Sequence, residues 1–207
     1  MSLQEEREMV GRVLRASTTG FDCGTRGSHL DERHVFGSFV KVPIAEDYST
    51  YAIGLIYAIR IEDDPLAREL VMASIVDNNA LLDQRENRMV PVEIGVINVG
   101  YTHGGDVIQS LPPRPPLSLS EVQLCSNDEI YYFTHRFDYF RVVLGASEVP
   151  SDELLAAAVR TATWAYPESE RYNFLVHCGR QLAGLLSHDL KRLSRVLALI
   201  KPDTNTQ

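Results

Sequence analysis

The sequence predicts an α+β protein: a small closed or partly open β-barrel of about six strands, with a helical insertion and a C-terminal helical appendage. Three observations lead to this fold class. β-Branched and alternating apolar residues fill the first sixty positions and return near position 90, glycines interrupt these strand segments, and helical spacing dominates after position 150. The 207 residues, of which 44% are hydrophobic and 23% charged, suffice for a globular fold with a real core.

The first sixty residues are predicted to form strands. Residues 10–16 alternate apolar side chains with arginine, and residues 21–23 are a short second strand. Residues 39–44 are rich in strand-forming types, and residues 51–61 are a long β-branched and aromatic run. Gly54 inside this run predicts the bulge or bend that a barrel strand needs in order to close.

A helical insertion is predicted at about residues 64–88. Asp64 can cap a helix N-terminus, and Pro65 suits the first helical position. Apolar residues then recur at helical spacing over residues 65–75. The pattern returns to strand over residues 90–101, so the insertion lies between two strands of the barrel.

The barrel segment is predicted to end with a crossing, a strand and a short helix. Residues 103–106 contain two glycines and predict a turn. The proline-rich residues 112–116 are a stiff extended crossing, and residues 121–124 are a short last strand. The Ser-Asn-Asp-Glu sequence at 126–129 matches a capping box, so a short aromatic helix is expected over residues 130–137.

Helical spacing replaces the strand pattern from position 150. Three helices are predicted there, over residues 151–164, 167–186 and 190–200. The polar tail from Asp203 is expected to be frayed. The predicted division is therefore a barrel with its insertion over residues 1–148 and a helical region over residues 149–207.

Charge and composition argue against several functions. The formal net charge is −8 and the isoelectric point is near 5.2. Such an anionic surface repels phosphate backbones, so direct nucleic-acid binding is not expected. The lysines are Lys41, Lys191 and Lys201, and none of them follows a glycine. A Walker A loop needs a lysine directly after a glycine to reach the nucleotide phosphates, so ATP hydrolysis is not expected either.

The sequence predicts a cytoplasmic protein without a membrane segment. No apolar run approaches the roughly 20 residues that span a bilayer. Residues 1–8 are acidic and polar, unlike a secretory signal. Cys23, Cys125 and Cys178 lie far apart and form no CxxC pair, which suits buried, reduced thiols. No cofactor is expected.

The order of several short motifs resembles a known family. Glycine-containing strand segments, a Ser-Thr pair, an Asn-Val-Gly-Tyr stretch and the proline-rich crossing carry the similarity. They lie at residues 11–13, 17–18 with Phe21, 37–40, 54–56, 98–101, and 112–116 leading to Val122. Over residues 9–137 this order resembles the HAS-barrel, the six-stranded N-terminal barrel of HerA-type DNA-translocating ATPases and of F-type ATP synthase subunits. Small barrels of the OB or translation-factor type show similar glycine, valine and isoleucine patterns.

The resemblance implies a role in assembly and docking. In HerA-like proteins the barrel precedes a P-loop ATPase core and contacts neighbouring subunits or a partner nuclease. This chain has no lysine placed for such a loop. It is therefore expected to be a non-enzymatic interaction module: a stand-alone HAS-barrel-like protein that docks on a HerA-like ATPase in DNA processing, or that assembles with copies of itself.

Three groups of side chains are candidates for contacts with a partner. They are Arg12, Arg15 and Arg60 on the barrel, Tyr131 and Tyr132 in the aromatic segment, and Lys191, Arg192 and Arg195 in the last helix. Arginines favour bidentate pairing with carboxylates, including those of a neighbouring subunit. The aromatic residues can instead pack between barrel and helices, or stack on the bases of a single strand. The basic residues of the last helix can instead form a solvated face that complements the helix dipole.

A polar loop offers an alternative function. His29, Asp31 and His34 lie close together in sequence, and imidazole and carboxylate groups suit zinc or manganese. The alternative is therefore a small metal-dependent hydrolase or a ligand-binding barrel that uses this loop. A solvated loop without a metal explains the same residues.

Overall fold

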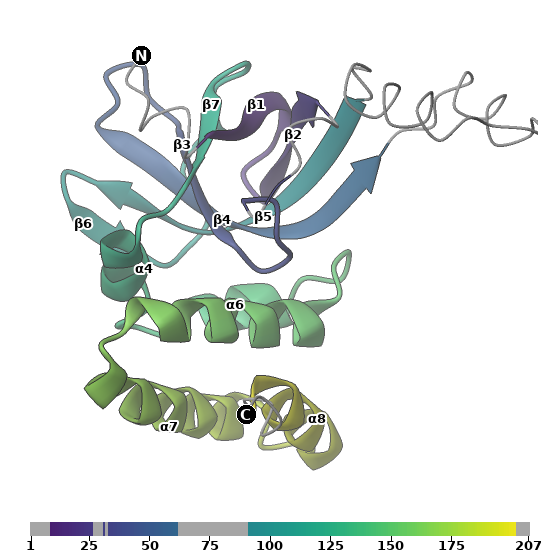
Figure 1. Ribbon diagram of the computed structural model, residues 1–207, viewed down its shortest axis with the longest axis vertical. Coiled ribbons are helices and arrows are strands. Elements are labelled where there is room, and N and C mark those ends of the chain that lie inside the picture. The colour runs from purple at the N-terminus through teal and green to yellow at the C-terminus, as the bar shows by residue number, and fades with distance from the viewer. Residues whose placement is uncertain (1–8, 27–30, 32, 62–90, 202–207) are drawn as a thin grey trace, which may run out of the picture.

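The computed structural model describes residues 9–26, 31, 33–61 and 91–201 (Figure 1). The predicted helical insertion at residues 64–88 and the tail from Asp203 lie outside the described residues. The strands are β1 (Met9–Ala16), β2 (Gly20–Arg26), β3 (Phe39–Pro43), β4 (Thr50–Ile61), β5 (Pro91–His103), β6 (Asp106–Ile108) and β7 (Glu121–Leu124). The helices are α4 (Asn127–Phe133), α5 (Tyr139–Leu144), α6 (Ser151–Ala165), α7 (Glu168–Leu185) and α8 (Leu190–Ile200).

Six antiparallel strands close into a barrel. Their order is β2-β1-β7-β3-β4-β5, and β2 pairs back onto β5 over seven residue pairs, from Gly20 with Ile97 to Arg26 with Pro91. A seventh strand, β6, extends the sheet beside β5. The predicted α+β fold around a barrel of about six strands is therefore confirmed.

Two irregularities bend the long strands β4 and β5. Their register shifts between Ile53 and Gly54 and again between Ile56 and Ala58. The bulge predicted at Gly54 is confirmed, and the position needs glycine, since a Cβ atom there would collide with the side chain of Val96. The bend lets β4 and β5 follow the curvature of the barrel.

The segment that follows the barrel differs from the prediction. The capping box is confirmed, because Ser126 Oγ accepts the Glu129 N–H and Glu129 accepts the Ser126 N–H. The predicted helix over residues 130–137 is wrong in its bounds: α4 already ends at Phe133, and α5 follows separately. The buried side chain of Gln109 satisfies backbone groups at this break. It donates to the carbonyl oxygens of Phe133 and Arg136 and accepts the Tyr139 N–H.

The strands contribute to two apolar cores. The inner core fills the barrel and includes Val10, Val13, Phe21, Val40, Val42, Ile56, Ile94, Val96 and Val122. The outer core lies between barrel and helices, and it joins Phe39 and Leu55 of the strands to Val143 and Leu154 of the helices. Phe39 and its neighbour Val40 enter different cores because successive strand side chains alternate. Residues on both sides of position 148 share the outer core.

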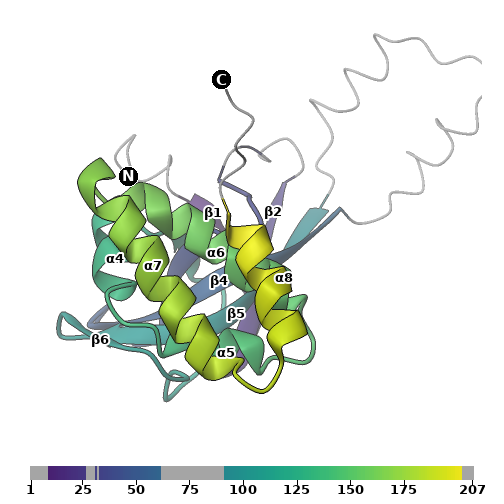
Figure 2. The ribbon, with the colours of Figure 1, turned by 90° about the horizontal axis from the view of Figure 1, so that it is seen from below.

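Helix α6 lies between the barrel and the layer formed by α7 and α8 (Figures 1 and 2). Three consecutive small residues of this helix, Ala156, Ala157 and Ala158, are buried. Ala157 and the backbone of Ala158 pack on Gly37, which has a φ of +86° and whose N–H donates to the Ile56 carbonyl at 2.8 Å. A Cβ atom on Gly37 would lie 2.5 Å from Ala157 Cβ. This close approach needs glycine on the barrel side and alanine on the helix side.

We expect the Gly37→Ala variant to lose about 2–4 kcal/mol of unfolding free energy, because alanine resists a positive φ and its methyl group pushes α6 off the barrel. Denaturant unfolding measures the loss. Gly184→Ala is the matched control: Gly184 lies in α7, and a Cβ atom there would contact nothing within 4 Å. The control should be neutral or gain up to about 1 kcal/mol. Equal effects in the two variants would contradict the contact.

Candidate interaction site

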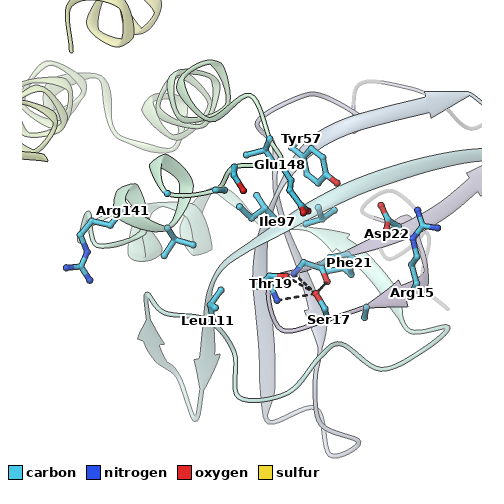
Figure 3. A pocket seen from close by; sticks show the side chains of 18 residues that line it. Arg15, Ser17, Thr19, Phe21, Asp22, Tyr57, Ile97, Leu111, Arg141 and Glu148 are labelled. Carbon is cyan, nitrogen blue, oxygen red and sulfur yellow. Dashed lines mark hydrogen bonds and ion pairs between the residues drawn. The ribbon is translucent and has the colours of Figure 1, made fainter. Parts of the chain in front are cut away.

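An open cleft of about 750 Å³ lies where the barrel meets the connection between α5 and α6 (Figure 3). One wall comes from Ser17 and Thr19 in the β1–β2 turn. The other comes from Arg141 on α5 and from the loop over residues 145–149. A volume of this size falls within the range of about 300–1,000 Å³ that is typical of ligand sites.

The β1–β2 turn is held in place by one buried side chain. Ser17 Oγ accepts the N–H groups of Thr19 and Gly20, which shapes the turn locally. The fully buried Asn98 of β5 then fixes it, because its Nδ2 donates to Thr18 O at 3.1 Å and its backbone N–H donates to Thr19 O at 2.9 Å. The motif residues at positions 17–18 and 98 therefore meet in space, and together they make the cleft wall rigid.

The cleft combines an apolar floor with charges at its rim. Ile97 is buried in the floor, and Leu111 is 44% exposed beside it. Figure 3 shows Arg141 and Arg15 toward opposite ends, with Ile97 and Glu148 between them. Arg141 and Glu148 make no side-chain hydrogen bond or ion pair with any residue that the structure describes. The rim therefore offers one unmatched positive and one unmatched negative charge.

The three candidate arginines of the barrel are paired within the chain. Arg15 contacts Asp22 at 2.6 Å and Glu93 at 2.7 Å, and the hydrogen bond to Asp22 raises the pKa of Arg15. Arg60 lies 3.4 Å from Glu93. Arg12 lies apart from this cluster and pairs with Glu121 at 2.5 Å. The three side chains therefore form no common cationic patch, because carboxylates of the same chain match them.

The basic residues of the last helix divide into two kinds. Arg192 binds Asp152 Oδ1 at 2.6 Å and Ser151 Oγ at 3.0 Å, so it joins α8 to the start of α6. Arg195 is mostly exposed, 3.9 Å from Asp152. Lys191 is exposed and has no side-chain partner in the described part of the chain. Only Lys191 and Arg195 remain available for an external contact.

The aromatic segment is mostly core. Phe133, Tyr139 and Phe140 are buried in the outer core. Tyr131 is half-buried, with its hydroxyl 3.1 Å from Glu170 and its ring against Tyr166. Tyr132 is 68% exposed. Packing between barrel and helices therefore accounts for most of this cluster, and Tyr132 is the member that faces solvent.

The described side chains of the polar loop already make hydrogen bonds within the chain. The His34 side chain is buried, its Nδ1 accepts the Asp31 N–H at 3.2 Å, and its Nε2 lies 3.0 Å from Val10 O. Hydrogen bonds from Arg33 lower the pKa of Asp31 to about 2. His29 lies outside the described residues. Over the described residues, no three His, Cys, Asp or Glu side chains are grouped so as to hold a metal. A metal at His34 would have to displace a backbone hydrogen bond.

The described cysteines are buried thiols. Burial raises the pKa of Cys23 and of Cys178 to about 12 and raises that of Cys125 as well. All three are free of disulfides. Such thiols are almost entirely protonated near neutral pH, so they are poor nucleophiles.

Comparisons with protein-family models and with curated proteins find no match to this chain. The geometry defines its class by fold: an α+β protein built on a closed six-stranded antiparallel barrel, with one added strand and five helices over the described residues. None of those helices is both long enough and apolar enough to cross a membrane. The HAS-barrel resemblance stays a prediction.

Sequence reasoning missed the cleft. Arg141, Glu148 and Leu111 belong to no motif, and three separate segments bring them together. One local signal was present: the Gly-Ala-Ser-Glu-Val-Pro sequence at residues 145–150 has the composition of a loop between two helices. Periodicity alone does not show which surface such a loop faces.

We expect Arg192→Ala to lower the unfolding free energy by about 1–3 kcal/mol, because it leaves the buried Asp152 carboxylate without its main partner. The neighbouring change Lys191→Ala is the control and should stay within about 0.5 kcal/mol of wild type. Chemical denaturation of both variants checks this. Similar losses in the two would mean that Arg192 does not anchor α8.

Thiol titration gives a second test. A thiol whose pKa is about 12 in Cys23 and Cys178 is only about one part in 10⁴ thiolate at pH 8. Dithionitrobenzoate should therefore label none of the three cysteines in the folded protein and all three in concentrated guanidinium chloride. The reactivity of a thiol falls when it is protonated, so labelling of the cysteines should stay slow until the pH approaches their raised pKa. Rapid labelling of the folded protein would reveal an accessible nucleophile and contradict this account.

Proposed function

We propose that this protein is a non-enzymatic interaction module whose barrel–helix cleft seats an extended segment of a partner protein. The observation that carries the proposal is the cleft itself, with its apolar floor and the unmatched charges of Arg141 and Glu148. The candidate arginines of the barrel already have carboxylate partners, including Arg15, which lines the cleft. In the described part of the chain, the cleft combines unmatched charges with an apolar floor, so a partner can match both there.

The chemistry of the other candidate groups supports binding rather than catalysis. The three thiols are buried, and His34 has a backbone contact at each ring nitrogen. A nucleophile must reach its substrate, and a general base needs a free nitrogen. These groups have neither property in the folded chain.

The cleft suggests the chemistry of the partner segment. Ile97 and Leu111 suit an apolar side chain, while Arg141 and Glu148 suit an acidic and a basic side chain on either side of it. An extended segment can supply these three side chains without forming a helix or other folded structure. The HAS-barrel resemblance suggests two partners to test first: a HerA-like ATPase in DNA processing, or a second copy of this chain.

We expect the chain to bind a purified HerA-type ATPase from the same organism. Leu111→Asp and Arg141→Glu should each weaken that binding at least about tenfold, because they place negative charge on the floor and at the rim of the cleft. Analytical ultracentrifugation or biolayer interferometry measures the affinity, and light scattering of the protein alone reports self-association.

Matched controls keep the test specific. Leu119→Asp makes the same change at another exposed leucine, and Arg180→Glu makes the same charge reversal on the exposed surface of α7. Neither residue lines the cleft. Both controls should bind like wild type. Equal loss in cleft variants and controls would exclude the cleft, and absence of any complex or self-association would exclude the docking role.

A further inference from the structure

A second, smaller cavity lies between α4 and the outer face of the barrel. Its volume is about 290 Å³, and strands β3 to β6 contribute to its walls together with α4. Figure 1 shows α4 close to β6. Apolar side chains form most of the lining, chiefly Phe39, Ile53, Val107, Ile130 and Phe133. None of these residues lines the cleft described above.

The charged groups in this cavity neutralise each other. Lys41 Nζ lies 2.5 Å from Glu129 Oε1. The other carboxylate oxygen of Glu129 accepts the Ser126 N–H at 2.8 Å as part of the helix cap. Glu129 is thereby fixed, and the Lys41–Glu129 pair adds no net charge to the wall. A charged ligand would bring an unmatched charge to a partly buried, already balanced pair, which is unfavourable.

The aromatic walls are held in defined positions. The Phe39 and Phe133 rings meet edge to face with centroids 5.9 Å apart. Phe133 also packs directly on β5, since a Cβ atom on Gly100 would lie 2.7 Å from the Phe133 ring. Aromatic rings attract one another in edge-to-face or offset-stacked geometry, so these rings offer a further ring suitable contacts. An apolar cavity of about 150 Å³ already accepts benzene in a protein, so the larger cavity here has room for one or two fused rings.

We propose that this cavity binds a small, uncharged aromatic molecule of one or two fused rings. The ligand lies against Phe39, Phe133 and Ile53, and it regains the dispersion contacts that an unfilled apolar cavity lacks. Tyr132, which is mostly exposed and belongs to the same lining, stands at the opening. This inference is independent of the proposed docking function, because it uses different residues.

Titration with indole tests the proposal. Calorimetry should show saturable one-to-one binding to the wild-type chain. Val107→Phe fills the cavity from β6 and should weaken indole binding at least about tenfold, because no room for a second ring remains. Ile108→Phe is the matched control: it follows Val107 on β6, points to the opposite face of the strand, and should change the affinity less than about twofold. The charged analogue indole-3-acetate should bind more weakly than indole.

Methyl NMR of the wild-type chain locates the ligand without a variant. Indole should shift the methyl signals of Ile53, Val107 and Ile130 and leave those of Val142 and Val149, which line the cleft, unchanged. Three results would overturn the proposal: no saturable binding of indole, shifts confined to the cleft residues, or equal weakening by Val107→Phe and Ile108→Phe. Tighter binding of indole-3-acetate than of indole would overturn the inference that the ligand is uncharged.

Discussion

The contact between α6 and the barrel positions the other helices and the loop that borders the cleft. Gly37 on the barrel and Ala157 on α6 let the helix and barrel backbones approach closely. α6 in turn packs against all the other described helices. Its first turn holds Asp152, to which Arg192 ties α8. The position of α6 on the barrel therefore also determines the position of the α5–α6 loop, which forms one wall of the cleft.

The chain is anionic, and several of the arginines that the structure describes pair with carboxylates of the same chain. Arg12, Arg15 and Arg60 bind carboxylates on neighbouring strands, and Arg192 binds one across two helices. Exposed pairs of this kind add little stability each, but they also remove positive charge from the surface. In the proposed function, recognition uses places where charge stays unmatched or apolar surface stays open, and the cleft with its rim combines both.

The interface between barrel and helices is filled in its middle and hollow on two sides. Phe39, Tyr139 and Phe140 pack its centre, where Gln109 also satisfies the backbone groups at the break between α4 and α5. Toward the α5–α6 loop the interface opens into the cleft, and under α4 it leaves the smaller cavity. Helices of different lengths on a curved barrel surface do not fill such an interface uniformly, and the cleft and the cavity lie where the packing ends.

Features that depend on neighbouring residues were readable from the amino-acid sequence. Strand periodicity, the glycine bulge at Gly54 and the capping box at Ser126 each depend on a few adjacent positions, and all three were predictable. The tertiary structure alone decided which distant groups meet. Gln109 binds the backbone of Phe133, 24 residues later, where the predicted helix is broken. Arg12 pairs with Glu121, which lies 109 residues further along the chain. His34 has an imidazole suited to a metal, but Val10 O occupies one ring nitrogen. Such pairings follow from barrel closure and strand register, which no local pattern contains.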